Sequence, residues 1–311
     1  MLSGISAYNG SFLADLNQSE ARISQDEQQI SSGVRVSQAS DDPSAVSSIL
    51  DYQEEIDRVT QVQTNLNTAS TTASAADTAL QSAATLLDQL VSIGSEGAST
   101  TTSAGAQASL ASQVQQIAQE VVGLANTTSQ GRYVFGSDGA TTQPYTFDWT
   151  VPKGVVQNST AANTSVLRDA SGNQITPALT AQQIFDVQSP PGTSANGNVF
   201  QAIYDLGTAL LLPNNAPSTQ TAIANATQEI QNAVTQIGQV TTTYGDTENW
   251  ITNAKTDASN RLVTLQTGLS SLQDTDVAEA ATQLSTDNTA LEASLSAHAS
   301  LSNKTLFSYL G

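Results

Sequence analysis

The segment from Ser44 to Ile93, SAVSSILDYQEEIDRVTQVQTNLNTASTTASAADTALQSAATLLDQLVSI, decides the fold of this chain. Apolar residues recur in it every seven positions, and they are Tyr52, Val59, Leu66, Ala73, Leu80 and Leu87. A second row lies three residues before or after the first, and its members are Ile49, Ile56, Ala76, Ala83 and Leu90. Rows at this spacing are typical of a long helix in a bundle or coiled coil, where alanine lets neighbours approach closely.

The positions of proline predict two helical arms around a centre that is not helical. One of the eight prolines is Pro43, and the other seven lie between Pro144 and Pro217. Proline in a helix interior costs about 3 kcal/mol. The proline-free segments 44–143 and 218–311 therefore favour long helices.

Apolar periodicity continues through both arms. A second helix is expected from about 106 to 126, after small polar residues end the first one. In the C-terminal arm, apolar residues from Ile251 to Leu272 alternate by three and four, and Gly245 is expected to interrupt or tighten the path before them. Asp274 to Asp276 is expected to break the arm, with an acidic cap on the helix that follows.

The two ends of the chain carry apolar stripes that are too narrow to form a core alone. Ordering each residue costs about 1–2 kcal/mol of backbone entropy, and a thin stripe buries little area in return. We therefore predict that these ends pack into neighbouring copies and become ordered only on assembly. The predicted interface residues are Leu13, Leu16, Ile23, Ile30, Val34, Leu284, Leu291, Leu295, Leu306, Phe307 and Leu310.

The centre has the pattern of short strands and turns. Its expected elements are a strand at 130–135 with a turn at 136–139, a strand on which Tyr145, Phe147, Trp149 and Val151 alternate, a hairpin at 165–176 and a short helix at 199–212. The predicted fold class is mainly α, with a long antiparallel helical bundle or coiled coil formed by the N- and C-terminal arms and a small inserted β-rich domain. The predicted domains are a terminal coiled-coil region (1–45 with 273–311), a helical rod (46–139 with 218–272) and an outer insert (140–217).

Composition excludes several classes of function. Nine basic residues against 28 acidic ones give a formal charge of −19, which disfavours binding to nucleic acid. With no cysteine and one histidine, thiolate metal sites and mechanisms that need several imidazoles are excluded. The first 19 residues lack the basic and apolar regions of a cleavable signal, and no stretch is apolar enough for membrane insertion.

The candidate chemical sites are better interpreted as structural residues. Asp41 and Asp42 could form a carboxylate pair, but Asp42 before Pro43 fits a helix N-cap. Asp274 and Asp276 lack the glycine and glutamate of a calcium loop. His298 stands in register with Leu291 and is expected to pack on the helix face. We therefore predict no catalytic residue, no metal site, no cofactor and no enzyme activity.

Residues 30–45 (ISSGVRVSQASDDPSA) resemble the N-terminal signature of the bacterial flagellin family. The matching motif residues are Ser32, Gly33, Arg35, Ala39, Asp41, Asp42 and Pro43. Residues 272–295 resemble the C-terminal helix of that family. Two further stretches resemble its hook-associated branch: residues 130–147 (QGRYVFGSDGATTQPYTF), with Ser137 in place of a glycine, and residues 306–310 (LFSYL), with Ser308 in place of an aspartate.

This resemblance implies a structural subunit of the flagellum that links hook to filament by helix packing. The implied partners are copies of the chain itself, the hook-side junction protein, flagellin and the flagellar export apparatus. The implied location is extracellular, reached by type III export without a cleaved signal peptide. Two alternatives stay open: a short filament-forming flagellin, and a secreted surface-binding, adhesin-like module that uses the aromatic residues of the insert.

Overall fold

The computed structural model describes residues 2–99, 102–136, 141–158, 166–187, 198–213 and 216–310, with side chains from residue 10 to residue 300 of these ranges. The chain divides into two compact units. The terminal unit comprises Met1–Arg58 with Leu262–Gly311, and the rod unit comprises Val59–Arg261.

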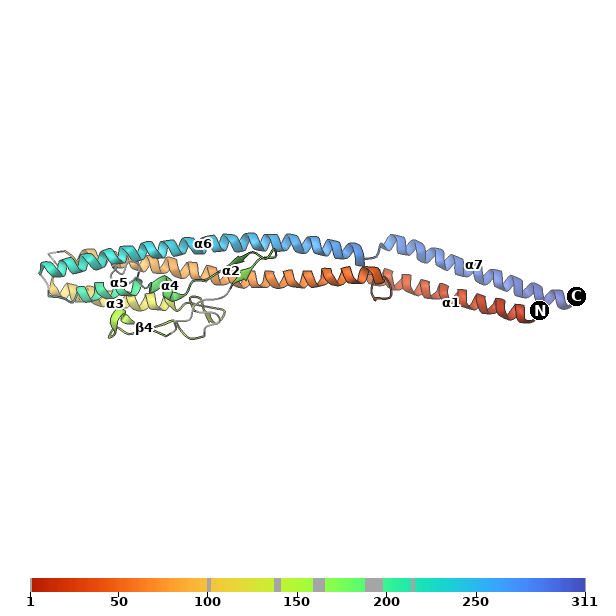
Figure 1. Cartoon of the computed structure of the whole chain (residues 1–311), viewed down its shortest axis with the longest axis horizontal. Coiled ribbons are helices and arrows are strands. Elements are labelled where there is room, and N and C mark those ends of the chain that lie inside the picture. The colour runs from red at the N-terminus through yellow and green to blue at the C-terminus, as the bar shows by residue number, and fades with distance from the viewer. Residues whose placement is uncertain are drawn as a thin grey trace. The chain divides into compact units, whose positions relative to one another are not determined.

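Helices dominate both units, as the proline pattern predicts (Figure 1). They are α1 (Leu2–Ser32), α2 (Pro43–Gly97), α3 (Ala104–Ala125), α4 (Ala181–Phe185), α5 (Val199–Ala209), α6 (Pro217–Gln273) and α7 (Val277–Leu310). The predicted long helix is confirmed by α2, which has 55 residues. The expectation that Gly245 interrupts the path is wrong, because α6 runs through it and packing of its neighbours Tyr244 and Thr247 outweighs the low helix propensity of one glycine.

The predicted break between α6 and α7 is confirmed. Asp276 caps α7, since its Oδ1 accepts hydrogen bonds from the backbone N–H of Ala278 (2.9 Å) and Glu279 (3.2 Å). A carboxylate at this position compensates the unpaired N–H groups and the positive end of the helix dipole.

The core of the rod unit follows the apolar rows of α2. The side chains of Val59, Leu66, Leu80, Leu87 and Leu90 are fully buried. Facing residues of α6 are equally buried, and they are Ile223, Ile230, Ala233 and Ile237. Fully burying one such aliphatic side chain stabilises the fold by about 1.5–3 kcal/mol, so these rows hold the two arms together.

The described strands of the insert form three separate antiparallel hairpins. They pair β1 (Thr128–Ser129) with β2 (Arg132–Tyr133), β3 (Tyr145–Phe147) with β4 (Val155–Gln157), and β5 (Leu167–Arg168) with β6 (Gln174–Ile175). The 3₁₀ turn η1 (Pro152–Gly154) precedes β4, and the last pairing confirms the hairpin predicted around Gly172.

The predicted strands are longer than the observed ones. The strand expected at 130–135 is reduced to β2, because Gln130 (φ 52°) and Gly131 (φ 77°) form the turn that reverses the chain. The alternating strand ends at Phe147 rather than Val151, because Asp148 accepts a hydrogen bond from the Thr150 N–H (2.9 Å) and turns the chain. Most of the expected turn at 136–139 lies outside the described residues.

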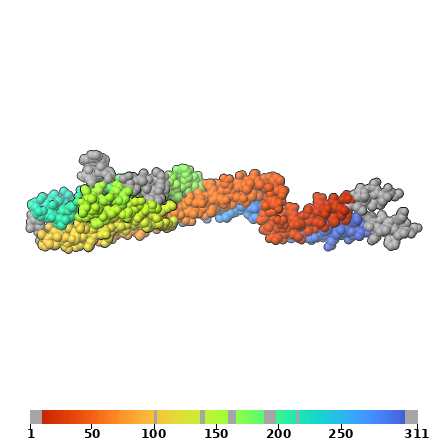
Figure 2. All heavy atoms as spheres, turned by 90° about the horizontal axis from the view of Figure 1, so that it is seen from below, coloured from red at the N-terminus to blue at the C-terminus, as the bar shows by residue number. Residues whose placement is uncertain are grey.

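The insert packs directly on the helices of the rod unit. Contacts join α3 to β3 and α5, and α5 to η1, and Figure 2 shows the lime-green insert residues lying against the yellow α3. Tyr145 is buried beside Phe200 (ring centroids 4.8 Å), and Trp149 packs on Tyr204 (5.2 Å). These aromatic residues, with Phe147, thus belong to the core and its margin rather than to an exposed binding platform.

A partly buried ion pair joins separate segments of the insert. Lys153, in a left-handed conformation (φ 71°), donates to Asp186 Oδ1 at 2.6 Å, and Asn198 donates to the same oxygen at 2.6 Å. The Tyr145 hydroxyl donates to Asp186 Oδ2 at 3.4 Å, and burial together with this carboxylate raises the Tyr145 pKa. Removing one member would leave a buried charge uncompensated.

Among the helices that the structure describes, none combines the length and apolar character required to cross a bilayer.

Candidate assembly interface and helix linker

Antiparallel pairing of α1 and α7 brings together most of the described interface residues predicted from sequence. We define the seam as Leu16, Ile23, Ile30, Leu284 and Leu291, and all five are half-buried. At one end of the pair, Phe12 stacks on His298 with ring centroids 3.9 Å apart, which confirms that this histidine packs on the helix face. At the other end, a backbone bridge joins the half-buried Val34 to Asp274.

The pairing leaves apolar surface uncovered. Leu13 of α1 and Leu295 of α7 are 56% and 45% exposed, outside the seam. Leu306, Phe307 and Leu310 lie in the last turns of α7, where side chains are outside the described residues. Two helices alone therefore bury only part of the predicted interface.

A polar layer interrupts the seam, and sequence reasoning missed it. We define this layer as Arg22, Asp26, Gln283 and Asp287. Arg22 Nε lies 3.5 Å from Asp287 Oδ2, and Gln283 donates to Asp287 Oδ1 at 3.2 Å. Heptad position could have indicated this layer. Asp26 follows Ile23 by three residues, and Asp287 follows Leu284 by three. Both aspartates therefore occupy the second position of a heptad that is normally apolar.

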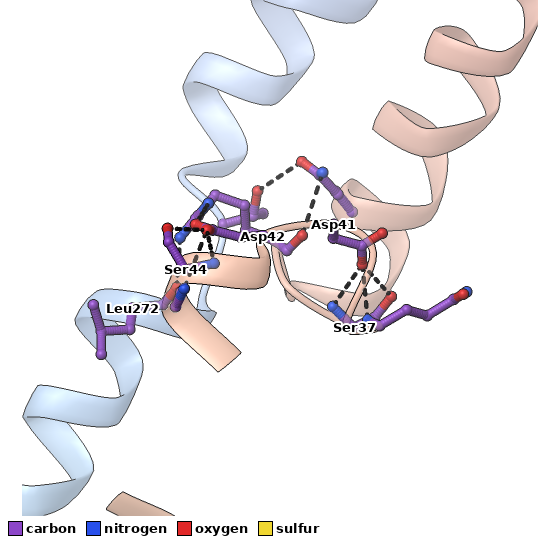
Figure 3. A network of polar contacts seen from close by, with 10 residues as sticks. Ser37, Asp41, Asp42, Ser44 and Leu272 are labelled. Atoms are coloured by element: carbon purple, nitrogen blue, oxygen red, sulfur yellow. Dashed lines mark hydrogen bonds and ion pairs between the residues drawn. The ribbon is translucent and has the colours of Figure 1, made fainter. Parts of the chain in front are cut away.

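The linker between α1 and α2 is folded by the signature motif (Figure 3). Gly33 has φ 71°, which permits the chain to leave α1, and its carbonyl accepts a hydrogen bond from the Thr275 N–H at 3.0 Å. The Arg35 guanidinium donates both to Asp42 Oδ2 (3.1 Å) and to the carbonyl of Leu272 (2.7 Å). Arg35 thus joins the start of α2 to the end of α6, whose last carbonyls have no partner within the helix.

The two adjacent aspartates have separate structural roles. Asp41 Oδ2 accepts hydrogen bonds from the backbone N–H of Ser37 (3.0 Å) and Gln38 (2.8 Å) and closes the loop (Figure 3). Asp42 Oδ1 accepts from the N–H groups of Ser44 (3.2 Å) and Ala45 (3.1 Å), and Pro43 is the first residue of α2. The predicted N-cap is confirmed.

A small apolar cluster packs the linker against the end of α6. Val36, Ala45 and Ile49 are buried, and Leu269 and Leu272 of α6 pack against them. The linker is therefore anchored by packing as well as by hydrogen bonds.

Acid is expected to weaken this linker. Hydrogen bonds from Gln38 and Ser37 lower the pKa of Asp41, and hydrogen bonds from Ser44, Arg35 and Ala45 lower that of Asp42. A lowered folded-state pKa contributes stability that is present above the ordinary value of 3.8 and is lost as pH falls through the folded-state value.

Asp42→Ala should reproduce this loss at neutral pH. The variant removes both the cap and the Arg35 ion pair, whereas Asp42→Asn keeps an oxygen acceptor for the cap and loses the charge. Hydrogen exchange of the first turn of α2 should therefore rank wild type slowest, Asp42→Asn intermediate and Asp42→Ala fastest. Equal exchange in all three proteins would contradict the role assigned to this side chain.

Within the described part of the chain, no group of three or more histidine or carboxylate side chains could hold a metal ion. The arrangement of the terminal unit serves packing and helix connection.

In this chain the N- and C-terminal helical arms pair with each other, and the insert separates them in the sequence. The profile of the bacterial flagellin N-terminal helical region matches residues 7–138, and that of the bacterial flagellin C-terminal helical region matches residues 227–310. The chain belongs to the bacterial flagellin family.

Several solved structures share the fold. A flagellar hook-associated protein from Vibrio parahaemolyticus is 19% identical, with a TM-score of 0.64, and the match covers 75% of this chain and 100% of that one. Flagellar hook-associated protein-3 from Legionella pneumophila is 14% identical, with a TM-score of 0.61 and coverage of 72% and 98%. FlgL from Bacillus cereus is 20% identical, with a TM-score of 0.54 and coverage of 71% and 100%. No curated protein sequence matches the chain.

Proposed function

We propose that this chain is a structural subunit of the bacterial flagellum that forms the junction between hook and filament. Membership of the flagellin family supports the flagellar role, and the fold shared with hook-associated proteins supports the junction position. The observation that carries the proposal is the seam, because its apolar heptad residues are only half-buried by the α1–α7 pair.

The proposed mechanism is packing, without a chemical step. Neighbouring helices can cover the exposed part of these half-buried leucine and isoleucine side chains. Each Å² of apolar surface removed from water in this way stabilises the assembly by about 25 cal/mol. The terminal helices would interlock with copies of the chain, with the hook-side junction protein and with flagellin, and would become fully ordered in that assembly. The insert would face outward, and the chain would leave the cell through the flagellar export apparatus without a cleaved signal.

Seeded assembly tests this proposal directly. Purified chain should add a short, limited layer to isolated hooks that carry the hook-side junction protein, and electron microscopy should show no long filament. A truncation ending at Gln273 lacks α7 and is the control that should not add. Growth of long filaments would instead identify a filament-forming flagellin, and failure of the full chain to add to hooks would contradict the junction role.

A further inference from the structure

The polar layer leaves two buried oxygens without hydrogen-bond partners. These are Oδ2 of Asp26 and Oδ2 of Asp287. The 3.5 Å approach of Arg22 to Asp287 Oδ2 is an ion-pair distance without hydrogen-bond geometry, and the Arg22 side chain is 49% exposed. Arg22 also donates to Ser19 Oγ at 3.1 Å. Within the seam, the negative charges of Asp26 and Asp287 are therefore offset only by this one half-exposed cation.

This arrangement opposes pairing when both carboxylates are charged. Burial and the negative charge of Asp287 raise the pKa of Asp26, and Arg22 offsets this only in part. These are the charged groups acting on Asp26, one from the facing helix α7 and one from its own helix α1. Protonation of one carboxyl would remove the repulsion and supply a donor for an unpartnered oxygen.

The same layer discriminates between registers of the two helices. Arg22 is the only basic residue among the first 34 residues, so α1 offers one position at which an acid from α7 is compensated. Moving α7 by one heptad would replace Asp287 with Ala280 or Ser294 and leave Arg22 without its ion pair. Polar groups within an apolar seam are known to select register at a cost in stability.

We propose that Arg22, Asp26 and Asp287 form a protonation-controlled lock that sets the register of α1 against α7 and keeps their pairing weak until a proton is bound. The lock is a property of the single chain, so it does not depend on the junction role. Its pH response is opposite in sign to that of the linker. Pairing is strongest below the ordinary pKa of 3.8 and weakens as pH rises through the raised folded-state value of Asp26.

Hydrogen exchange of the full-length chain in solution tests the lock. Exchange rates for segments 19–30 and 280–291 are converted to protection factors to remove the chemical pH dependence. For wild type, protection should increase as pH falls from 7 to the ordinary aspartate value of 3.8. Asp26→Asn supplies a neutral amide of the same shape. It should raise protection at pH 7 on the order of tenfold, because the buried Asp26 Oδ2 is no longer a charged oxygen without a partner, and it should abolish the pH response.

Two further variants make the outcome decisive. Asp15→Asn removes the same charge from an exposed position of α1 and should leave both protection and its pH response unchanged. Arg22→Gln should lower protection at pH 7, because the remaining cation is removed. Lower protection in Asp26→Asn, or a wild-type chain whose terminal protection does not vary with pH, would overturn the proposal.

Discussion

Leu284→Asp combined with Leu291→Asp is expected to abolish incorporation of the chain into the flagellum and, with it, motility. Both leucines are half-buried in the seam against α1, and each substitution replaces apolar contact with a charge that must be desolvated. The loss is on the order of 2–4 kcal/mol for the pair within one subunit. The same loss occurs in every subunit of the assembly, so incorporation should fail entirely.

Complementation of a strain that lacks the gene for this chain provides the measurement. Swimming in soft agar and electron microscopy of cell-attached hooks report incorporation. Tryptophan fluorescence reports folding of the rod unit alone, because Trp149 and Trp250, the two tryptophans of the chain, both lie in it. The double variant should keep the wild-type fluorescence transition.

A matched pair of charges on the opposite face of α7 separates the seam from charge itself. Thr286→Asp with Ala293→Asp places two aspartates at the same spacing on exposed positions. Successive residues of a helix are rotated by about 100°, so these positions point away from the seam. This variant should still incorporate. Normal motility of the Leu284→Asp, Leu291→Asp chain would refute the role of the seam.

Gly94→Ala is expected to destabilise the rod unit, although alanine favours helix over glycine. A Cβ at this position of α2 would lie 2.2 Å from Thr227 Oγ1 and 3.2 Å from two carbons of the same side chain in α6. Thr227 is buried and donates to the Ile223 carbonyl at 2.7 Å, so it has little freedom to move. Such overpacking costs about 1–3 kcal/mol and should exceed the gain in helix propensity of about 1 kcal/mol.

Gly238→Ala is the control and should have the opposite sign. Gly238 lies inside α6, and a Cβ there would meet nothing within 4 Å. The substitution should therefore stabilise the chain by about 0.5–1 kcal/mol. Denaturant unfolding followed by tryptophan fluorescence measures both variants. A more stable Gly94→Ala chain would show that α2 and α6 do not approach as closely as described.

The conformations of the helices and their caps follow from local rules, which is why they were predictable. Apolar residues at heptad spacing, such as Val59, Leu66 and Leu80, must be covered by some apolar surface. Their burial could therefore be inferred from spacing alone, without knowing which helix covers them. The cap by Asp42 and the break before α7 depend on residues within one turn. The predicted strands are too long, because the turns at Gln130 and Asp148 outweigh a short alternating pattern.

The sequence by itself determined the two helical arms, the hairpin around Gly172 and the caps of α2 and α7, because periodicity, turn residues and capping act over a few residues. Only the tertiary structure decided that Arg35 would reach the carbonyl of Leu272 and that Asp26 and Asp287 would meet in one layer. These contacts join residues more than 200 positions apart, and their energies depend on the register between helices, which no single stretch of the chain encodes.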